Sequence, residues 1–133
     1  MEHAVHTRSI QIGRILLGVY FLLPGIMKIA AWGMHVQLMQ HHNIPFTEPL
    51  LAIATAANIG LGLLLIFNQY VRFAAYACVA YIVVINIGLH DFWNFTGIEA
   101  EHETQNFVKN LGILAGLLVL AGYSRRSSDP SGA

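Results

Sequence analysis

The sequence predicts an all-α membrane protein: one domain of 133 residues, built as an antiparallel bundle of four transmembrane helices. Four apolar stretches fill most of the chain, and each has about the 20 residues that a helix needs to cross a bilayer core. Charged residues make up only 11% of the chain, whereas soluble domains carry about 25%, so the protein cannot cover itself with a water-facing surface. Apolar runs such as 61–67 lack the alternation of a barrel strand, which favours helices as the spanning elements.

The four helices are expected in order at about 10–31, 49–68, 71–89 and 107–123. Pro24 and Gly25 should kink the first of them. Short connections place sequence neighbours antiparallel, which completes a membrane domain at 1–123. The polar tail 124–133 contains Pro and Gly and is expected to be disordered.

The distribution of Lys and Arg predicts that both termini lie in the cytoplasm. The long connections 32–48 and 90–106 contain acidic residues but no Lys or Arg. Basic residues flank the opposite helix ends, at Arg8, Arg14, Arg72, Arg125 and Arg126. Because cytoplasmic flanks are enriched in Lys and Arg, the long connections should lie outside. Four spans satisfy this arrangement.

Small residues recur every four positions at Ala52, Ala56 and Gly60, and again at Gly112 and Gly116. Such faces let helix backbones approach closely in lipid. We expect them to pack inside the bundle, with a dimer face as the alternative.

Charges inside the apolar stretches need a structural or functional reason, because burying a charge in lipid is costly. In the first helix, Arg14 and Lys28 share one stripe with Gly18 and Gly25, so both cations should face protein or extend to opposite interfaces. Lys109 has helical spacing to Gly112 and Gly116, which predicts that it shares their packing face. A further polar residue, Asn58, is expected to be an interhelical hydrogen-bond partner.

Six polar residues fall at one depth, in the outer third of the bundle, and are the candidate ligand-binding site. They are Lys28, Asn86, His90, Asp91, Lys109 and Asn110. Two lysines and one aspartate at this depth suggest a charge network.

The outer connections are rich in His, including His35, His41, His42 and His102, beside Glu99, Glu101 and Glu103. These are metal-ligand types, but their spacing matches no defined motif, so we expect ordinary polar loops and no metal site. No His lies at a helix centre, which disfavours an intrinsic haem. The single Cys78 is expected to be a packing residue. A net charge of zero and no arginine-rich face give no reason to expect nucleic-acid binding.

The segment GRILLGVYFLLPGIMKIAAW at 13–32 resembles the first helix of the DoxX family, with its Arg and Gly-x-x-Lys positions. HDFW at 90–93 and QNFVKNLGILAGLLVLAG at 105–122 resemble that family's third-helix end and fourth helix. The motif positions are Arg14, Gly25, Lys28, His90, Asp91, Lys109 and Asn110. The resemblance implies a small four-helix protein of a bacterial or archaeal inner or plasma membrane, with oxidoreductase-associated or assembly roles.

One departure is the second helix, where the family often has a glutamate and this chain has AANIGLG with Asn58. The missing carboxylate leaves Arg14 and Lys28 without an acidic partner on that helix and disfavours a proton relay there.

The leading hypothesis is a membrane subunit of a quinone-linked electron-transfer system that is not catalytic alone. Lys28, Lys109 and His90 would bind the head group of a quinone-like amphiphile, and Asp91 would orient His90 or balance the lysines. No intrinsic cofactor is expected; a flavin or haem would belong to a partner protein. The alternatives are a non-enzymatic assembly factor or structural subunit, acting with another membrane protein or a second copy of the chain, and, less favoured, a small transporter.

Overall fold

The computed structural model describes residues 2–124, and within them it confirms the all-helical membrane fold. Four long helices are α1 (Glu2–Ala30), α3 (Thr47–Ile66), α4 (Val71–Gly88) and α5 (Gly97–Tyr123). A shorter helix, α2 (Trp32–His41), and a single 3₁₀ turn, η1 (Phe92–Asn94), lie in the two long connections. Each long helix contains a segment long and apolar enough to cross a membrane.

Two of these helices extend well beyond their apolar windows. α1 begins at Glu2 instead of residue 10 and continues through Pro24, and α5 begins at Gly97 instead of residue 107. The first two turns of α5 are polar, but Glu, Ala and Gln are good helix formers and need no lipid to remain helical. Hydropathy therefore located the membrane spans but underestimated the lengths of these two helices.

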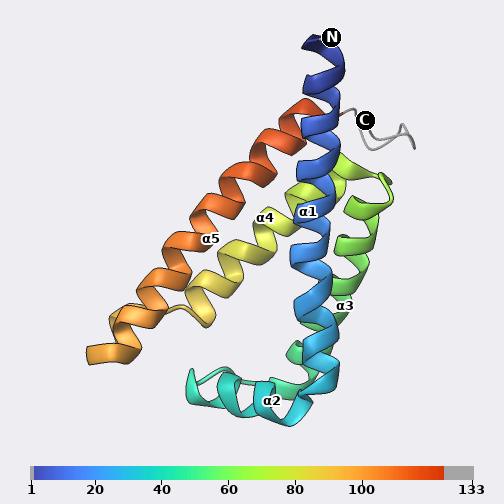
Figure 1. Cartoon of the computed structure of the whole chain (residues 1–133). Coiled ribbons are helices and arrows are strands. Elements are labelled where there is room, and N and C mark those ends of the chain that lie inside the picture. The colour runs from blue at the N-terminus through green and yellow to red at the C-terminus, as the bar shows by residue number, and fades with distance from the viewer. Residues whose placement is uncertain (1, 125–133) are drawn as a thin grey trace.

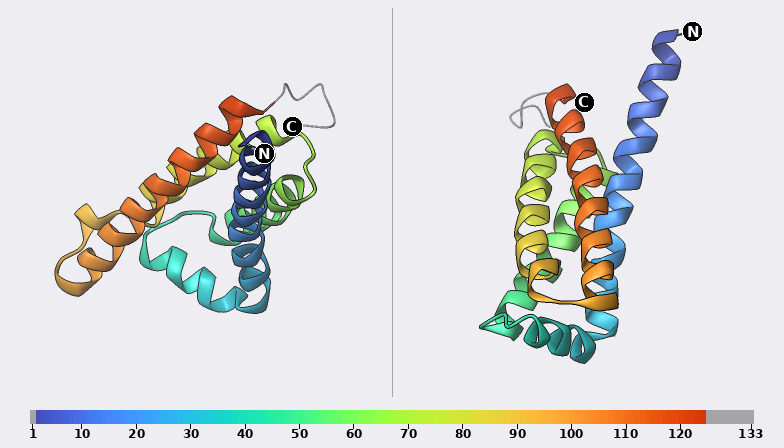
Figure 2. Two further views of the ribbon diagram at one scale, coloured as in Figure 1. Left: turned by 45° about the horizontal axis from the view of Figure 1, so that its top comes forward. Right: turned by 90° about the vertical axis from the view of Figure 1, so that its left-hand side faces the viewer.

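The helices form two closely packed pairs, α1 with α3 and α4 with α5. Figure 1 shows that the pairs converge near the N-terminal end of α4 and diverge towards α2. Helix α2 lies across that end of the bundle, which we call the α2 end (Figure 2). The start of α1 and the end of α5 lie at the opposite end, which we call the termini end.

A continuous apolar core joins the two pairs, mostly where they converge. Its members are buried residues of α1, α3, α4 and α5: Phe21, Leu65, Val71, Ala74, Ala75, Cys78, Ile82, Leu117, Leu120 and Ala121. Cys78 is fully buried among them, in the packing position that the sequence predicts. Residues 125–133, which hold most of the predicted disordered tail, lie outside the described residues, while Ser124 is buried and donates a hydrogen bond to the Leu120 carbonyl.

Close approach of α1 to α3 depends on Gly18 and Gly25, which lie on the stripe that the sequence predicts to face protein. A Cβ at Gly18 would lie 2.8 Å from the Gly62 carbonyl oxygen, and one at Gly25 would lie 2.9 Å from the Asn58 Cβ. These positions join α1 to α3 with almost no side chain between the backbones.

The predicted small-residue faces do not pack inside the bundle. Ala52, Ala56, Gly60 and Gly112 are exposed, and a Cβ at Gly60, Gly112 or Gly116 would meet no atom within 4 Å. The prediction was wrong because a four-residue repeat identifies a helix face without saying which way that face is turned.

Candidate functional site

A cavity of about 470 Å³ opens between the diverging helix pairs at the α2 end. All five α-helices contribute to its wall, and the apolar side chains include Phe21, Leu51, Ile82 and Ile113. Four of the six predicted site residues line it: Lys28, His90, Lys109 and Asn110. These residues come from three separate parts of the chain, and the structure brings them together around one continuous space. We call it the α2-end cavity.

The two lysines contribute positive charge to this cavity without a carboxylate partner. Lys28 is half-buried on the α1 side, while Lys109 is exposed at the rim on α5. Among the residues with described side chains, no ion pair involves either lysine. The predicted network of two lysines with Asp91 is therefore not formed. Lys109 also does not lie on a packing face of α5, which instead buries Asn110 and Leu117.

A chain of amide hydrogen bonds fixes Asn110 between three helices. The Tyr20 hydroxyl of α1 donates to Asn110 Oδ1 over 2.9 Å, and Asn110 Nδ2 donates to Asn86 Oδ1 over 3.0 Å. Asn86 Nδ2 in turn donates to the Phe107 carbonyl over 3.2 Å. Asn86 is thus buried next to the cavity and positions Asn110 without lining the cavity itself.

Asn58 has a similar structural role between α3 and α4. The Tyr81 hydroxyl donates to Asn58 Oδ1 over 2.7 Å, and Asn58 is almost fully buried. This is the interhelical hydrogen bond that the sequence predicts for it. Both side chains line the α2-end cavity, so the bond also sets the shape of its wall.

A histidine at the end of α2 pairs with two carboxylates, one after α4 and one on α5. The His42 side chain is 1% exposed; its Nδ1 lies 2.6 Å from Asp91 Oδ1 and its Nε2 lies 3.0 Å from Glu103 Oε2. Both ring nitrogens therefore face carboxylate oxygens, and one imidazole joins Asp91 to Glu103. Glu103 Oε1 also lies 3.0 Å from His90 Nδ1.

These contacts assign Asp91 a different role from the predicted one. Asp91 pairs with His42 and accepts a 2.7 Å hydrogen bond from Asn94, whereas Glu103 is the carboxylate that holds the His90 ring. Asp91 is buried and does not line the cavity. It stabilises the turn at the end of α4, while Glu103 orients His90.

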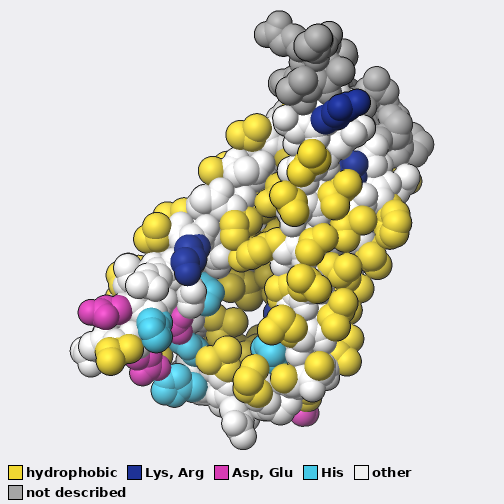
Figure 3. Space-filling view, in the orientation of Figure 1, with side chains coloured by type: hydrophobic (Ala, Val, Ile, Leu, Met, Phe, Trp, Pro, Cys, Tyr) yellow, Lys and Arg dark blue, Asp and Glu magenta, His cyan; other side chains and the backbone are white. Residues whose placement is uncertain are grey.

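His42 and Glu103 were missed as site residues because the sequence places them in polar connections that were expected to be ordinary loops. Their only signal is the presence of His and Glu in connections without Lys or Arg. Figure 3 shows His and acidic side chains gathered at the α2 end, while hydrophobic side chains cover most of the remaining face. Within the described residues, no three His, Cys, Asp or Glu side chains are arranged to hold a metal ion.

Arg14 lies at the other end of the bundle and has a structural role. It is 8% exposed and donates from one guanidinium nitrogen to the Leu65 carbonyl over 2.5 Å and the Ile66 carbonyl over 3.0 Å. The last carbonyls of a helix lack intrahelical donors. Arg14 supplies a donor to the Ile66 carbonyl and a second one to the Leu65 carbonyl, which also accepts the Asn68 N–H over 3.4 Å. It therefore faces protein, and the missing glutamate on α3 does not leave it without partners.

Comparison with known proteins identifies the family. The sequence model of the DoxX family matches residues 9–91, more than half of the chain, and this region contains Arg14, Lys28, His90 and Asp91. Inner membrane protein YphA of Escherichia coli (strain K12) is 28% identical over 110 residues, which are 83% of this chain and 79% of that protein. No solved structure gives a significant match. With four helices able to span a membrane and this match, the chain belongs to the DoxX family.

Proposed function

We propose that the protein is a membrane subunit of a quinone-linked electron-transfer system and binds a quinone-like amphiphile in the α2-end cavity. The observation that carries this proposal is the convergence of Lys28, His90 and Lys109 on one space of about 470 Å³. Ligand cavities usually measure about 300–1,000 Å³ and combine apolar walls with a few converging polar groups.

The polar groups suit the two oxygens of a quinone head group. The ammonium groups of Lys28 and Lys109 are hydrogen-bond donors, and no carboxylate among the described side chains pairs with them. His90 is held through Nδ1 by Glu103, which leaves Nε2 available to the ligand. Quinone reduction adds two electrons and two protons, so a positioned histidine next to cationic donors would stabilise charge on the oxygens and exchange a proton.

The remaining parts of the system follow from the same proposal. The electrons would pass to or from a flavin or haem on a partner protein. The name of the YphA relative supports a bacterial inner membrane as the location. The distribution of Lys and Arg supports cytoplasmic termini, and with that orientation the α2-end cavity would lie in the outer leaflet.

The test is native mass spectrometry of the full chain in native lipid discs. The wild type should retain a ligand of quinone mass, and Lys109→Ala should lose it while remaining helical. Arg8→Ala is the matched control, because Arg8 is an exposed cation at the termini end. Retention of the ligand by Lys109→Ala, or an unchanged quinone-reduction rate in the assembled complex, would argue against the proposed site.

A second candidate function is a non-enzymatic assembly factor or accessory subunit. It is favoured by the exposed face of Ala52, Ala56 and Gly60 on α3, where another membrane helix would approach closely. In that case the protein should copurify with one partner in fixed stoichiometry and retain no quinone. Replacing Gly60 with Leu should then release the partner without unfolding the chain.

A further inference from the structure

A second, larger space lies between α1 and α5 and joins the α2-end cavity. It has a volume of about 780 Å³, and its walls are mainly apolar or small side chains, among them Leu16, Leu17, Gly116, Val119 and Leu120. We call it the α1–α5 groove. It exists because the two helices pack mainly on other partners and diverge from each other (Figure 1).

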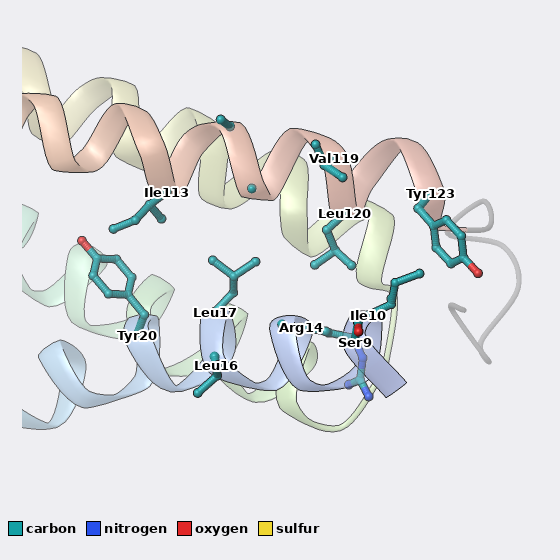
Figure 4. A pocket seen from close by; sticks show the side chains of 13 residues that line it. Ser9, Ile10, Arg14, Leu16, Leu17, Tyr20, Ile113, Val119, Leu120 and Tyr123 are labelled. Atoms are coloured by element: carbon teal, nitrogen blue, oxygen red, sulfur yellow. The ribbon is translucent and has the colours of Figure 1, made fainter. Parts of the chain in front are cut away.

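The groove has two distinct ends. Figure 4 shows Leu17 and Leu120 pointing into the gap from opposite walls, with Tyr20 and Ile113 at one end and Tyr123 at the other. Tyr20 and Ile113 also line the α2-end cavity. The polar cavity and the apolar groove are therefore adjacent, and the hydrogen bond from Tyr20 to Asn110 lies at their junction.

The position and length of the groove suit a hydrocarbon chain attached to a head group in the α2-end cavity. Along α1 the groove extends from Ser9 to Tyr20, which at 1.5 Å per residue is about 17 Å. It begins at Tyr20 and Ile113, the residues that it shares with the α2-end cavity. Because α1 and α5 both have membrane-spanning segments, the open side of the groove faces lipid and admits a flexible chain sideways.

We propose that the α1–α5 groove holds the hydrocarbon tail of the ligand whose head group occupies the α2-end cavity. The inference rests on the proposed function and narrows the ligand class to quinones with a long prenyl tail. The head would lie among Lys28, His90 and Lys109, and the tail would run past Tyr20 between α1 and α5 towards the termini end.

Three glycines allow a direct test. Gly116 lines the groove and Gly112, one turn away on α5, does not; a Cβ at either meets no atom within 4 Å. Gly116→Leu should fill the groove, and Gly112→Leu adds the same side chain outside it. Gly13→Leu fills the groove from the facing wall, since Gly13 also lines it and also has open space. Circular dichroism in discs checks that each variant is folded.

The probes are two benzoquinones that carry a photoreactive group, one with a single isoprene unit and one with a long prenyl tail. In Gly116→Leu and Gly13→Leu, labelling by the long-tailed probe should fall at least about tenfold, while labelling by the short-tailed probe should stay at the wild-type level. In Gly112→Leu, labelling by both probes should stay at the wild-type level. When the photoreactive group is on the tail of the long-tailed probe, peptide mapping should place the label on α1 and α5.

The outcomes separate the two proposals. If both probes bind and depend on Lys109 but Gly116→Leu binds the long-tailed probe normally, the tail site is refuted and the head site stands. If a photoreactive phospholipid labels the groove and is not displaced by the long-tailed quinone, the groove is an ordinary lipid site and the inference fails. If neither quinone binds the wild type, both proposals fail.

Discussion

The contact between α1 and α3 should be more sensitive to one methyl group than any exposed face of the protein. In Gly62→Ala the new Cβ would lie 2.8 Å from the Gly18 carbonyl oxygen and 2.8 Å from the Leu22 backbone nitrogen. Both atoms are backbone, so no side chain can rotate away to make room. The helices themselves must separate.

The size of the effect follows from the distances. Ordinary contacts begin at 3.4 Å, so the two backbones must part by about 0.6 Å at this point. Overpacking of this kind costs about 1–3 kcal/mol. The higher helix propensity of Ala offsets up to about 1 kcal/mol of that loss. Gly60→Ala receives the same propensity gain on the same helix, and its Cβ meets nothing within 4 Å.

The assay is unfolding of the two variants in detergent by a denaturing-detergent titration followed by circular dichroism. Gly62→Ala should have a free energy of unfolding about 1–3 kcal/mol below that of Gly60→Ala. Equal stability of the two variants would refute the close α1–α3 packing and the assignment of Gly62 to it.

Three further predictions use the same titration. His42→Ala should lower the free energy of unfolding by about 3–5 kcal/mol, because it leaves the buried Asp91 carboxylate and the partly buried Glu103 carboxylate without their shared partner. His41→Ala removes an exposed ion pair and ring contacts with His42 and Phe95, and should change the free energy of unfolding by at most about 1 kcal/mol; equal losses would contradict the burial of His42. Arg14→Leu should cost about 1.5–3 kcal/mol, because the Ile66 carbonyl loses its side-chain donor and the Leu65 carbonyl keeps only the long hydrogen bond from the Asn68 N–H; a neutral result would mean that Arg14 extends to the interface instead. Tyr81→Phe should cost about 1–3 kcal/mol by leaving the Asn58 oxygen buried without a donor, and no loss of stability would show that this hydrogen bond does not form.

A substantial part of the candidate site could be predicted from sequence because helical geometry converts spacing into depth. Lys28, His90, Lys109 and Asn110 were grouped by their distance from the helix ends, and the structure places all four on one cavity. Depth is a property of each helix alone, since every residue adds a fixed rise.

The partners of these residues could not be predicted in the same way. Asp91 was expected to orient His90 or to balance the lysines, but it pairs with His42, which is 49 residues away in a connection expected to be a polar loop. Glu103 was expected in a similar loop but lies on α5 and binds both His42 and His90. Such pairings depend on how α2 lies across the bundle, and no periodicity within a helix encodes that position.

The sequence by itself determined that the chain forms four membrane helices and that cations and amides share one depth, because hydropathy and helical rise are local properties. Only the tertiary structure decided which face of α3 turns inward: Gly62 packs against the predicted glycine stripe of α1, while Ala52, Ala56 and Gly60 face outward, as does Gly112 on α5. It also decided that α1 and α5 diverge and leave a groove beside the cavity. Helix rotation and crossing depend on the summed contacts of all the helices at once, which one helix's pattern of residues does not contain.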